Sequence, residues 1–216
     1  MENKTVIGFI GAGNMAYALI KGLLSDGFEA KNINVSDANL ELLEKRSSEL
    51  GVTTYSDNVS LLTNSDIVVF AVKPQVLSVV CHELKNKASS DQLFVSIVAG
   101  IKSKDINRWL GGDFALVRTM PNTPALFQSG VTGLFANELV NDTQKESVNL
   151  LLSAVGECFW VNEENLLDAI TAISGSGPAY FFLMMQSMKQ AAMALGLDEE
   201  TAVSYTHLTL PTSVIV

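Results

Sequence analysis

The sequence predicts an α/β fold in which helices cover both faces of a parallel, doubly wound sheet. Three observations carry this prediction. Short apolar segments alternate with segments of helical periodicity, as in parallel sheets built from β-α-β units. Residues 66–72 are apolar and β-branched almost throughout, which is typical of a strand buried on both faces. A glycine-rich turn joins the first expected strand directly to the first expected helix.

The elements follow in order along the first part of the chain. The expected strands are residues 5–10, 33–36, 52–55, 66–72, 93–98, 115–118 and 158–161. Apolar residues recur at helical spacing over 15–23, 40–50, 76–84 and 148–155. Neither a repeat nor a linker divides this region, so residues 1–161 are predicted to form one domain.

The chain is predicted to become helical over residues 162–203, which start a second domain. A helix is expected over 165–173, and the segment S-G-S-G-P at 174–178 is expected to break it. The next helix, 179–195, is apolar almost all the way round. Such a helix must be buried, either in a large core or against a partner chain.

Residues 204–216 disagree with this helical pattern. Asp198 is a plausible N-cap for one more helix, but the sequence after Val203 is β-prone and contains Pro211. A conflict of this kind between local preference and context is evidence against a native design. We therefore predict that 204–216 is an aberrant tail.

Composition excludes several classes of partner and site. Lys and Arg number 14 against 23 Asp and Glu, so a net charge of −9 gives no general attraction to nucleic acid or anionic membrane. No apolar run approaches the roughly 18 residues of a membrane span. Cys81 and Cys158 lack CxxC spacing and are expected to be free thiols, which favours the cytoplasm. No metal site is predicted, because no His, Cys and Asp residues have ligand spacing.

Gly11-Ala12-Gly13-Asn14-Met15-Ala16 fits the pattern G-x-G-x-x-A between a strand and a helix. Gly11 permits the tight turn, Gly13 lets a pyrophosphate approach the backbone, and Ala16 keeps helix and strand close. The helix start offers free N–H groups and a positive dipole end to phosphates. The pattern predicts a Rossmann-type site for a nicotinamide dinucleotide, with a purely structural glycine turn as the alternative.

The end of the second strand leaves the choice of dinucleotide open. Asp37 could accept hydrogen bonds from a ribose 2′-hydroxyl, which favours NAD. Lys45 and Arg46 lie at least a helical turn further along, so this loop holds no arginine for a 2′-phosphate. Asp37 could instead cap the following helix, and Ser36 and Asn39 could bond a phosphate.

Two further loops follow strands of the predicted sheet. Lys73, in Ala71-Val72-Lys73-Pro74, is placed to reach a ribose or phosphate, with a solvated lysine as the alternative. Two prolines stiffen Met120–Pro124, which presents Asn122 either as part of a site or as a rigid turn.

No nucleophilic triad accompanies the dinucleotide site. His82 is expected on the surface of a helix, where it has no catalytic partners. A dinucleotide site without an acid–base pair indicates hydride transfer, in which the cofactor supplies the chemistry.

Taken together, five segments resemble the pyrroline-5-carboxylate reductases, the family that makes proline. They are Gly8–Ala16, Ala71–Pro74, Ser96–Gly100, Arg118–Pro124 and Ser174–Tyr180, in the order and spacing of the family. The R-T-M-P-N-T-P and S-G-S-G-P-A-Y segments are close to diagnostic. The resemblance covers about residues 4–202.

The resemblance implies that hydride from NADPH, or from NADH, reduces the imine of 1-pyrroline-5-carboxylate to L-proline in a homo-oligomer. It implies dinucleotide contacts, to which Ser36 and Asp37 are added from the second strand: Ile10, Gly11, Ala12, Gly13, Asn14, Met15, Asn58, Ala71, Val72, Lys73, Pro74, Ala99 and Gly100. Asn122, Ser174 and Ser176 are the expected catalytic residues. Ser174, Gly175, Ser176 and Gly177 are expected to line the substrate pocket.

The family continues with a helical dimerisation domain that carries an S-P-G-G-T-T segment, which this sequence lacks. We therefore expect a member of the family that is truncated or frameshifted after about residue 203. Two alternatives stay open. One is a catalytically inactive dinucleotide-binding fragment. The other is a reductase like the β-hydroxyacid dehydrogenases, which would use Lys189 as acid and base.

Overall fold

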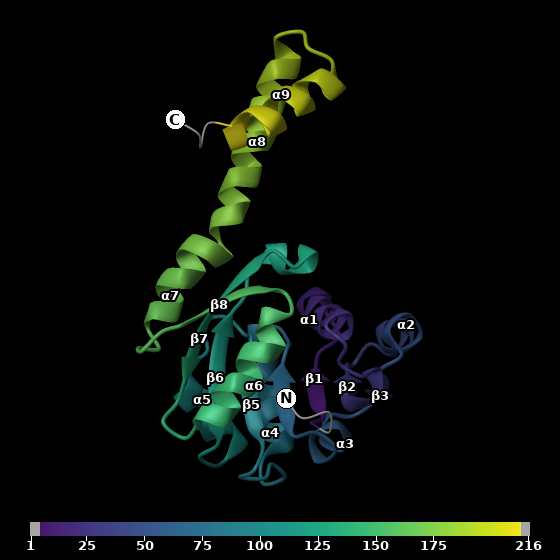
Figure 1. Ribbon diagram of the computed structural model, residues 1–216, viewed down its shortest axis with the longest axis vertical. Helices are drawn as coiled ribbons and strands as arrows, with labels where there is room; N and C mark the ends of the chain where they lie inside the picture. The colour runs from purple at the N-terminus through teal and green to yellow at the C-terminus, as the bar shows by residue number, and fades with distance from the viewer. Residues whose placement is uncertain (1–4, 213–216) are drawn as a thin grey trace. The chain divides into compact units, whose positions relative to one another are not determined.

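The computed structural model describes residues 5–212 of the chain, with side chains to residue 207. Contacts divide the chain into one compact unit that ends at Thr171 and a second that begins at Ala172. The first unit contains the whole sheet and its flanking helices (Figure 1).

The sheet of the first unit has the strand order β3-β2-β1-β4-β5-β6-β7-β8. Its strands are β1 (Ile7–Ile10), β2 (Ile33–Ser36), β3 (Thr53–Tyr55), β4 (Ile67–Phe70), β5 (Leu93–Ser96), β6 (Ala115–Met120), β7 (Gly130–Ala136) and β8 (Gly156–Trp160). All neighbouring strands are parallel except β6 and β7. The predicted doubly wound sheet is confirmed. The sheet is mixed and not wholly parallel, because β7 runs antiparallel to β6, and the sequence pattern did not predict β7.

Helices cover the sheet on both faces, as predicted. In the first unit they are α1 (Asn14–Ser25), α2 (Leu40–Leu50), α3 (Asn58–Thr63), α4 (Pro74–Leu84), α5 (Ser103–Leu110), α6 (Asp142–Ser153) and α7 (Leu166–Ile170). Side chains of α1, α2 and α6 share one buried cluster with Ile67 and Val69 of β4. Side chains of α3, α4 and α5 share the other with Val68 and Phe70 of the same strand. The alternation along β4 thus supplies both cores.

Gly11, between β1 and α1, is required by its conformation and by its neighbours. Its φ of +106° is unfavourable for other residues. A Cβ atom at this position would lie 2.5 Å from the carbonyl oxygen of Ala71. The turn therefore brings the chain against the end of β4 more closely than any side chain permits.

The second unit begins within a helical segment. The predicted break at 174–178 is found as an interruption of the regular α-helix. After α7 the chain forms a π turn (Thr171–Gly175) and a bend at Ser176, and α8 (Gly177–Ala194) begins after them. Pro178 lies in the first turn of α8, where its missing N–H costs little. The glycines and the proline thus lie at the junction between two helical elements.

Helix α9 (Glu199–Thr212) continues through most of the predicted aberrant tail. The expectation that 204–212 would not be helical is wrong, and residues 213–216 lie outside the described residues. Asp198 caps the helix, since its Oδ1 accepts from the Thr201 N–H at 2.9 Å. Thr206 is buried, and its hydroxyl donates to the Ala202 carbonyl at 2.7 Å. Packing within the unit and these local bonds outweigh the small helix penalty of threonine.

One helical segment is long and apolar enough to cross a membrane by length and composition alone. It runs from Leu166 to Ala194, and 11% of its span-length window is buried. No such segment is expected from the sequence, in which no apolar run approaches the roughly 18 residues of a membrane span. A lone helix of this kind is weak evidence for a membrane span.

Gly11→Ala is expected to destabilise the protein more than Gly27→Ala. Both glycines have positive φ, but a Cβ at Gly27 meets open space, whereas a Cβ at Gly11 collides with backbone. We expect a loss of about 1 kcal/mol at Gly27 and at least about 2 kcal/mol at Gly11. Urea unfolding of both variants measures the difference, and equal losses would contradict the close approach to Ala71.

Candidate dinucleotide site

The loops that follow four neighbouring strands are held at one edge of the sheet. The Gly11 N–H donates to the Ser36 carbonyl at 2.7 Å, which ties the ends of β1 and β2. The Ala71 N–H donates to the Ile10 carbonyl at 2.8 Å, and the Ile97 N–H donates to the Phe70 carbonyl at 3.2 Å. The ends of β2, β1, β4 and β5 therefore form one edge, where ligands of such sheets bind.

The start of α1 offers an open backbone at this edge. Gly13 is the N-cap of α1, is exposed, and supplies no side chain to satisfy the first amides. A Cβ at Gly13 would meet no atom within 4 Å. Asn14 is also exposed and Met15 is half-buried, whereas Ile10 and Ala12 are buried, each in one of the two core clusters. The exposed amides fit a pyrophosphate, which needs N–H groups and space.

The structure gives Asp37 two backbone partners. Its Oδ2 accepts from the Ala12 N–H at 2.8 Å, and its Oδ1 accepts from the Asn39 N–H at 2.9 Å. Asn39 itself caps α2 by accepting from the Leu42 N–H at 3.1 Å. Asp37 thus connects the glycine-rich loop to the start of α2.

Ser36 and Asn58 form a chain of side-chain hydrogen bonds. The Ser36 hydroxyl, only 1% exposed, donates to Oδ1 of Asn58 at 2.8 Å. Nδ2 of Asn58 donates to Oε2 of Glu83 at 2.9 Å. Sequence reasoning missed Glu83, which lies near the far end of α4, and nothing in its local sequence distinguishes it.

The predicted contacts after β4 and β5 are accessible. Lys73 is the exposed N-cap residue of α4, and Pro74 occupies the first turn. Ala71, Val72 and Ala99 are half-buried. Gly100 is exposed with a φ of +76°, and a Cβ there would meet no atom within 4 Å.

Asn122 anchors the loop that follows β6. Its Oδ1 accepts from the Val131 N–H of β7 at 2.9 Å. The next residues form a 3₁₀ turn (Thr123–Phe127) that packs against α1 and buries Ala125. The loop is therefore fixed to both β7 and the helix that opens the dinucleotide site.

An ion pair joins the buried Arg118 of β6 to the half-buried Glu164, which precedes α7. Nη1 of Arg118 lies 3.0 Å from Oε1 of Glu164, and this oxygen also accepts from the Ser103 N–H at 2.6 Å. Burial alone would raise the pKa of Glu164, but the Ser103 amide and the Arg118 guanidinium outweigh it and lower that pKa. The sequence did not identify Glu164 as the partner of Arg118, because the two residues lie 46 positions apart.

The predicted substrate residues belong to the second unit. Ser174 and Gly175 end the π turn, Ser176 is the N-cap of α8, and Gly177 is its first residue. All four are half-buried. Lys189, further along α8, forms an ion pair with Glu199 at 2.6 Å.

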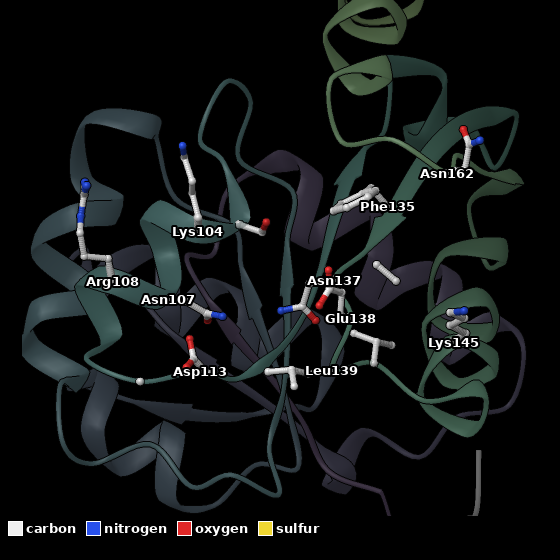
Figure 2. A pocket seen from close by; sticks show the side chains of 14 residues that line it. Lys104, Asn107, Arg108, Asp113, Phe135, Asn137, Glu138, Leu139, Lys145 and Asn162 are labelled. Carbon is white, nitrogen blue, oxygen red and sulfur yellow. The ribbon is translucent and has the colours of Figure 1, made fainter.

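A cavity of about 980 Å³ lies beside α5, the end of β7 and the segment before α6 (Figure 2). Its lining combines Lys104, Arg108 and Lys145 with Asp113 and Glu138, so it offers no field of one sign to a phosphate. None of the residues predicted to bind a dinucleotide or substrate lines this cavity. The open backbone at Gly13, and not this cavity, matches the predicted cofactor site.

Comparisons with known proteins match two segments of the chain to family models. Residues 6–100 match the family described as NADP oxidoreductase coenzyme F420-dependent, and residues 164–214 match the family described as pyrroline-5-carboxylate reductase dimerisation. The chain is 46% identical to the pyrroline-5-carboxylate reductase of Pseudomonas aeruginosa, over 96% of this chain and 75% of that protein. The chain belongs to the pyrroline-5-carboxylate reductase family. The family member of Haemophilus influenzae is 44% identical over 94% of this chain and 74% of its own length.

Solved members of the pyrroline-5-carboxylate reductase family have the same fold. The structure from Coxiella burnetii has a TM-score of 0.88 and 40% identity, and it covers 98% of this chain and 78% of its own. The structure from Plasmodium falciparum, described with NADP bound, has a TM-score of 0.85 and 30% identity over the same shares. Prephenate dehydrogenase from Aquifex aeolicus, at 14% identity and a TM-score of 0.66, shares the fold alone.

Glu164→Gln is expected to destabilise the protein at neutral pH and much less at acidic pH. Because the pKa of Glu164 is lowered on folding, the ion pair contributes stability above the ordinary glutamate pKa and loses it as pH falls through the folded-state value. We expect a loss of about 2 kcal/mol at neutral pH. Chemical denaturation across the acidic range follows the convergence of the two proteins.

Asp105→Asn provides the matched control for this pH series. Asp105 pairs with Arg108 at 3.0 Å, but the arginine side chain is 69% exposed, so the pair contributes little. A Glu164→Gln deficit that does not shrink with acid would refute the role of the ionised carboxylate.

Proposed function

We propose that this chain is a reductase that transfers hydride from NADPH to the imine carbon of 1-pyrroline-5-carboxylate and forms L-proline, the last step of proline biosynthesis. NADH is the alternative donor. The observation that carries the cofactor site is the uncapped, exposed start of α1 at Gly13, beside the ends of four parallel strands. The identity to the reductase of Pseudomonas aeruginosa supports the substrate.

In this proposal the first unit binds and orients the dinucleotide. The amides of Gly13, Asn14 and Met15 bind the pyrophosphate, and Lys73 reaches a phosphate or ribose oxygen. Ala99 and Gly100 flank the nicotinamide ring, since they follow a strand near the middle of the sheet. The bound nicotinamide supplies the hydride. Asn122 holds its loop beside α1 and so limits the positions open to the ring.

The substrate needs little acid catalysis, because the carbon of a protonated imine is already electrophilic. Its binding site must hold that carbon over the nicotinamide and bind the carboxylate. We assign Ser174 and Ser176 and the backbone of Gly175 and Gly177 to the carboxylate. Support comes from the position of these residues at the start of the 18-residue α8, where the helix dipole favours an anion.

We further propose that the reductase is a homo-oligomer that pairs through its second unit. Phe181, Phe182 and Leu183 of α8 are 67%, 64% and 63% exposed in the single chain. A group of large apolar side chains that are exposed together marks a contact site. The dimerisation-family match at 164–214 supports a second copy, rather than a membrane, as its partner.

Both cysteines support a reducing, cytoplasmic location. Cys81 and Cys158 are free, and burial raises the pKa of the Cys81 thiol to about 12, which keeps it protonated and unreactive.

The purified chain is expected to oxidise NADPH only when 1-pyrroline-5-carboxylate is present, with L-proline as the product. Absorbance of the reduced nicotinamide and chromatography of the amino acid measure the two sides of the reaction. Dinucleotide binding without turnover would support the inactive binding fragment instead. Oxidation of a β-hydroxyacid with NAD would support the alternative reductase, and no dinucleotide binding at all would refute the proposal.

Gly13→Ala is expected to weaken NADPH binding at least about tenfold while the fold stays intact. The φ of Gly13 is −66° and a Cβ there meets open space, so stability should change by less than about 1 kcal/mol. The added methyl occupies the space that the pyrophosphate needs. Fluorescence titration measures the affinity, and urea unfolding measures the stability.

Ser25→Ala at the other end of α1 is the control, because its hydroxyl donates to the Lys21 carbonyl of the same helix at 2.9 Å. Unchanged NADPH affinity in Gly13→Ala would contradict the assignment of this backbone to the pyrophosphate.

A further inference from the structure

We propose that Asp37 and Arg46 are positioning residues that together clamp Ala12, and that they preset the glycine-rich loop for NADPH and NADH alike. The inference rests on the proposed dinucleotide binding. It gives Asp37 a task other than accepting from a ribose hydroxyl, and Arg46 a task other than binding a 2′-phosphate.

The carboxylate of Asp37 holds the peptide that precedes Ala12. Its Oδ2 accepts from the Ala12 N–H at 2.8 Å, while its Oδ1 accepts from the Asn39 N–H at 2.9 Å. Each carboxylate oxygen thus has a backbone donor. The position of Asp37 is consequently fixed by the protein itself.

The guanidinium of Arg46 holds the peptide that follows Ala12. Its Nε donates to the Ala12 carbonyl at 3.1 Å, and its Nη1 pairs with Glu49 at 3.2 Å. Its central carbon lies 4.2 Å from the ring centre of Tyr17 on α1. Arg46 is only 7% exposed, so its charge is enclosed between α1 and α2.

Because the peptide bond is planar, the contact to the Ala12 carbonyl also fixes the direction of the Gly13 N–H. The carbonyl of Ala12 and the N–H of Gly13 belong to one trans peptide and point in opposite directions. Because Arg46 holds the carbonyl, the Gly13 N–H is directed away from Arg46. Gly13 is the exposed residue whose amide is proposed to meet the pyrophosphate. Arg46 therefore orients that amide through contacts that the protein itself supplies.

We assign neither charged side chain to the recognition of the ribose 2′ position. Both charged side chains are held by contacts within the protein: the carboxylate of Asp37 accepts from two backbone amides, and Arg46 is buried, stacked on Tyr17 and paired with Glu49. A residue that reads the 2′ position changes the affinity for one dinucleotide relative to the other. A residue that positions the loop changes both affinities equally, because NADH and NADPH share the pyrophosphate.

The test compares the dissociation constants of NADH and NADPH in Arg46→Met and Asp37→Asn. Methionine keeps the apolar stem beside Tyr17 and removes the donor, while asparagine places an N–H against one of the two amides. We expect both dissociation constants to rise about tenfold, with a ratio that stays within about twofold of the unsubstituted chain. Lys45→Met is the matched control, since Lys45 is 62% exposed and lies 3.8 Å from the same Glu49. It should leave both constants unchanged.

A measurement without cofactor separates positioning from contact. Amide hydrogen exchange of the loop around Ala12 should accelerate in Arg46→Met and Asp37→Asn but not in Lys45→Met, because the clamp consists of protein groups alone. If Asp37→Asn proves too unstable to purify, Arg46→Met carries both measurements.

Other outcomes would overturn the clamp. Weakened NADPH binding alone in Arg46→Met would make Arg46 a reader of the 2′-phosphate. Weakened NADH binding alone in Asp37→Asn would make Asp37 a reader of the ribose hydroxyl. Unchanged exchange at the loop in both variants would remove the positioning role. If the unsubstituted chain bound neither dinucleotide, the proposed function would fail before the clamp was tested.

Discussion

The contact between Gly11 and the Ala71 carbonyl is the constraint on which the rest of the first unit depends. It brings the turn after β1 onto the end of β4, and the Gly11 N–H joins the same turn to β2. The ends of three strands are thus packed around one residue without a side chain. The start of α1 is then left at the edge of the sheet with its amides uncovered, which is the physical basis of an anion site.

Much of this arrangement could be predicted from local patterns. Parallel strands buried on both faces are apolar throughout, and the glycine-rich turn has a recognisable order, so β1, β4 and α1 were placed correctly. The strand β7 was missed because Gly133 interrupts its pattern, and this glycine is needed where Leu167 and Ile170 pack against the strand. The partners of Arg118 and Asn58 could not be found, since Glu164 and Glu83 meet them only through folding.

The segment between α7 and α8 shows how the chain accommodates a local conflict. The sequence between Thr171 and Pro178 is unfavourable for a regular α-helix, and a π turn followed by a bend replaces the α-helix there. The threonines of α9 favour strands in isolation, but Thr206 and Ala202 are buried in the helical unit. In α9, packing within the unit overrides the propensities of the single residues.

The ion pair between Arg118 and Glu164 joins the segment after the last strand to the sheet. Arg118 lies in the sheet with a side chain 5% exposed, whereas Glu164 follows the last strand and belongs to the segment that leads into α7. A chain that ended at Trp160 would contain every strand but would leave a buried guanidinium without its counter-charge, which is unfavourable. A fragment that keeps this ion pair therefore extends beyond the sheet. The first compact unit, which ends at Thr171, contains both partners.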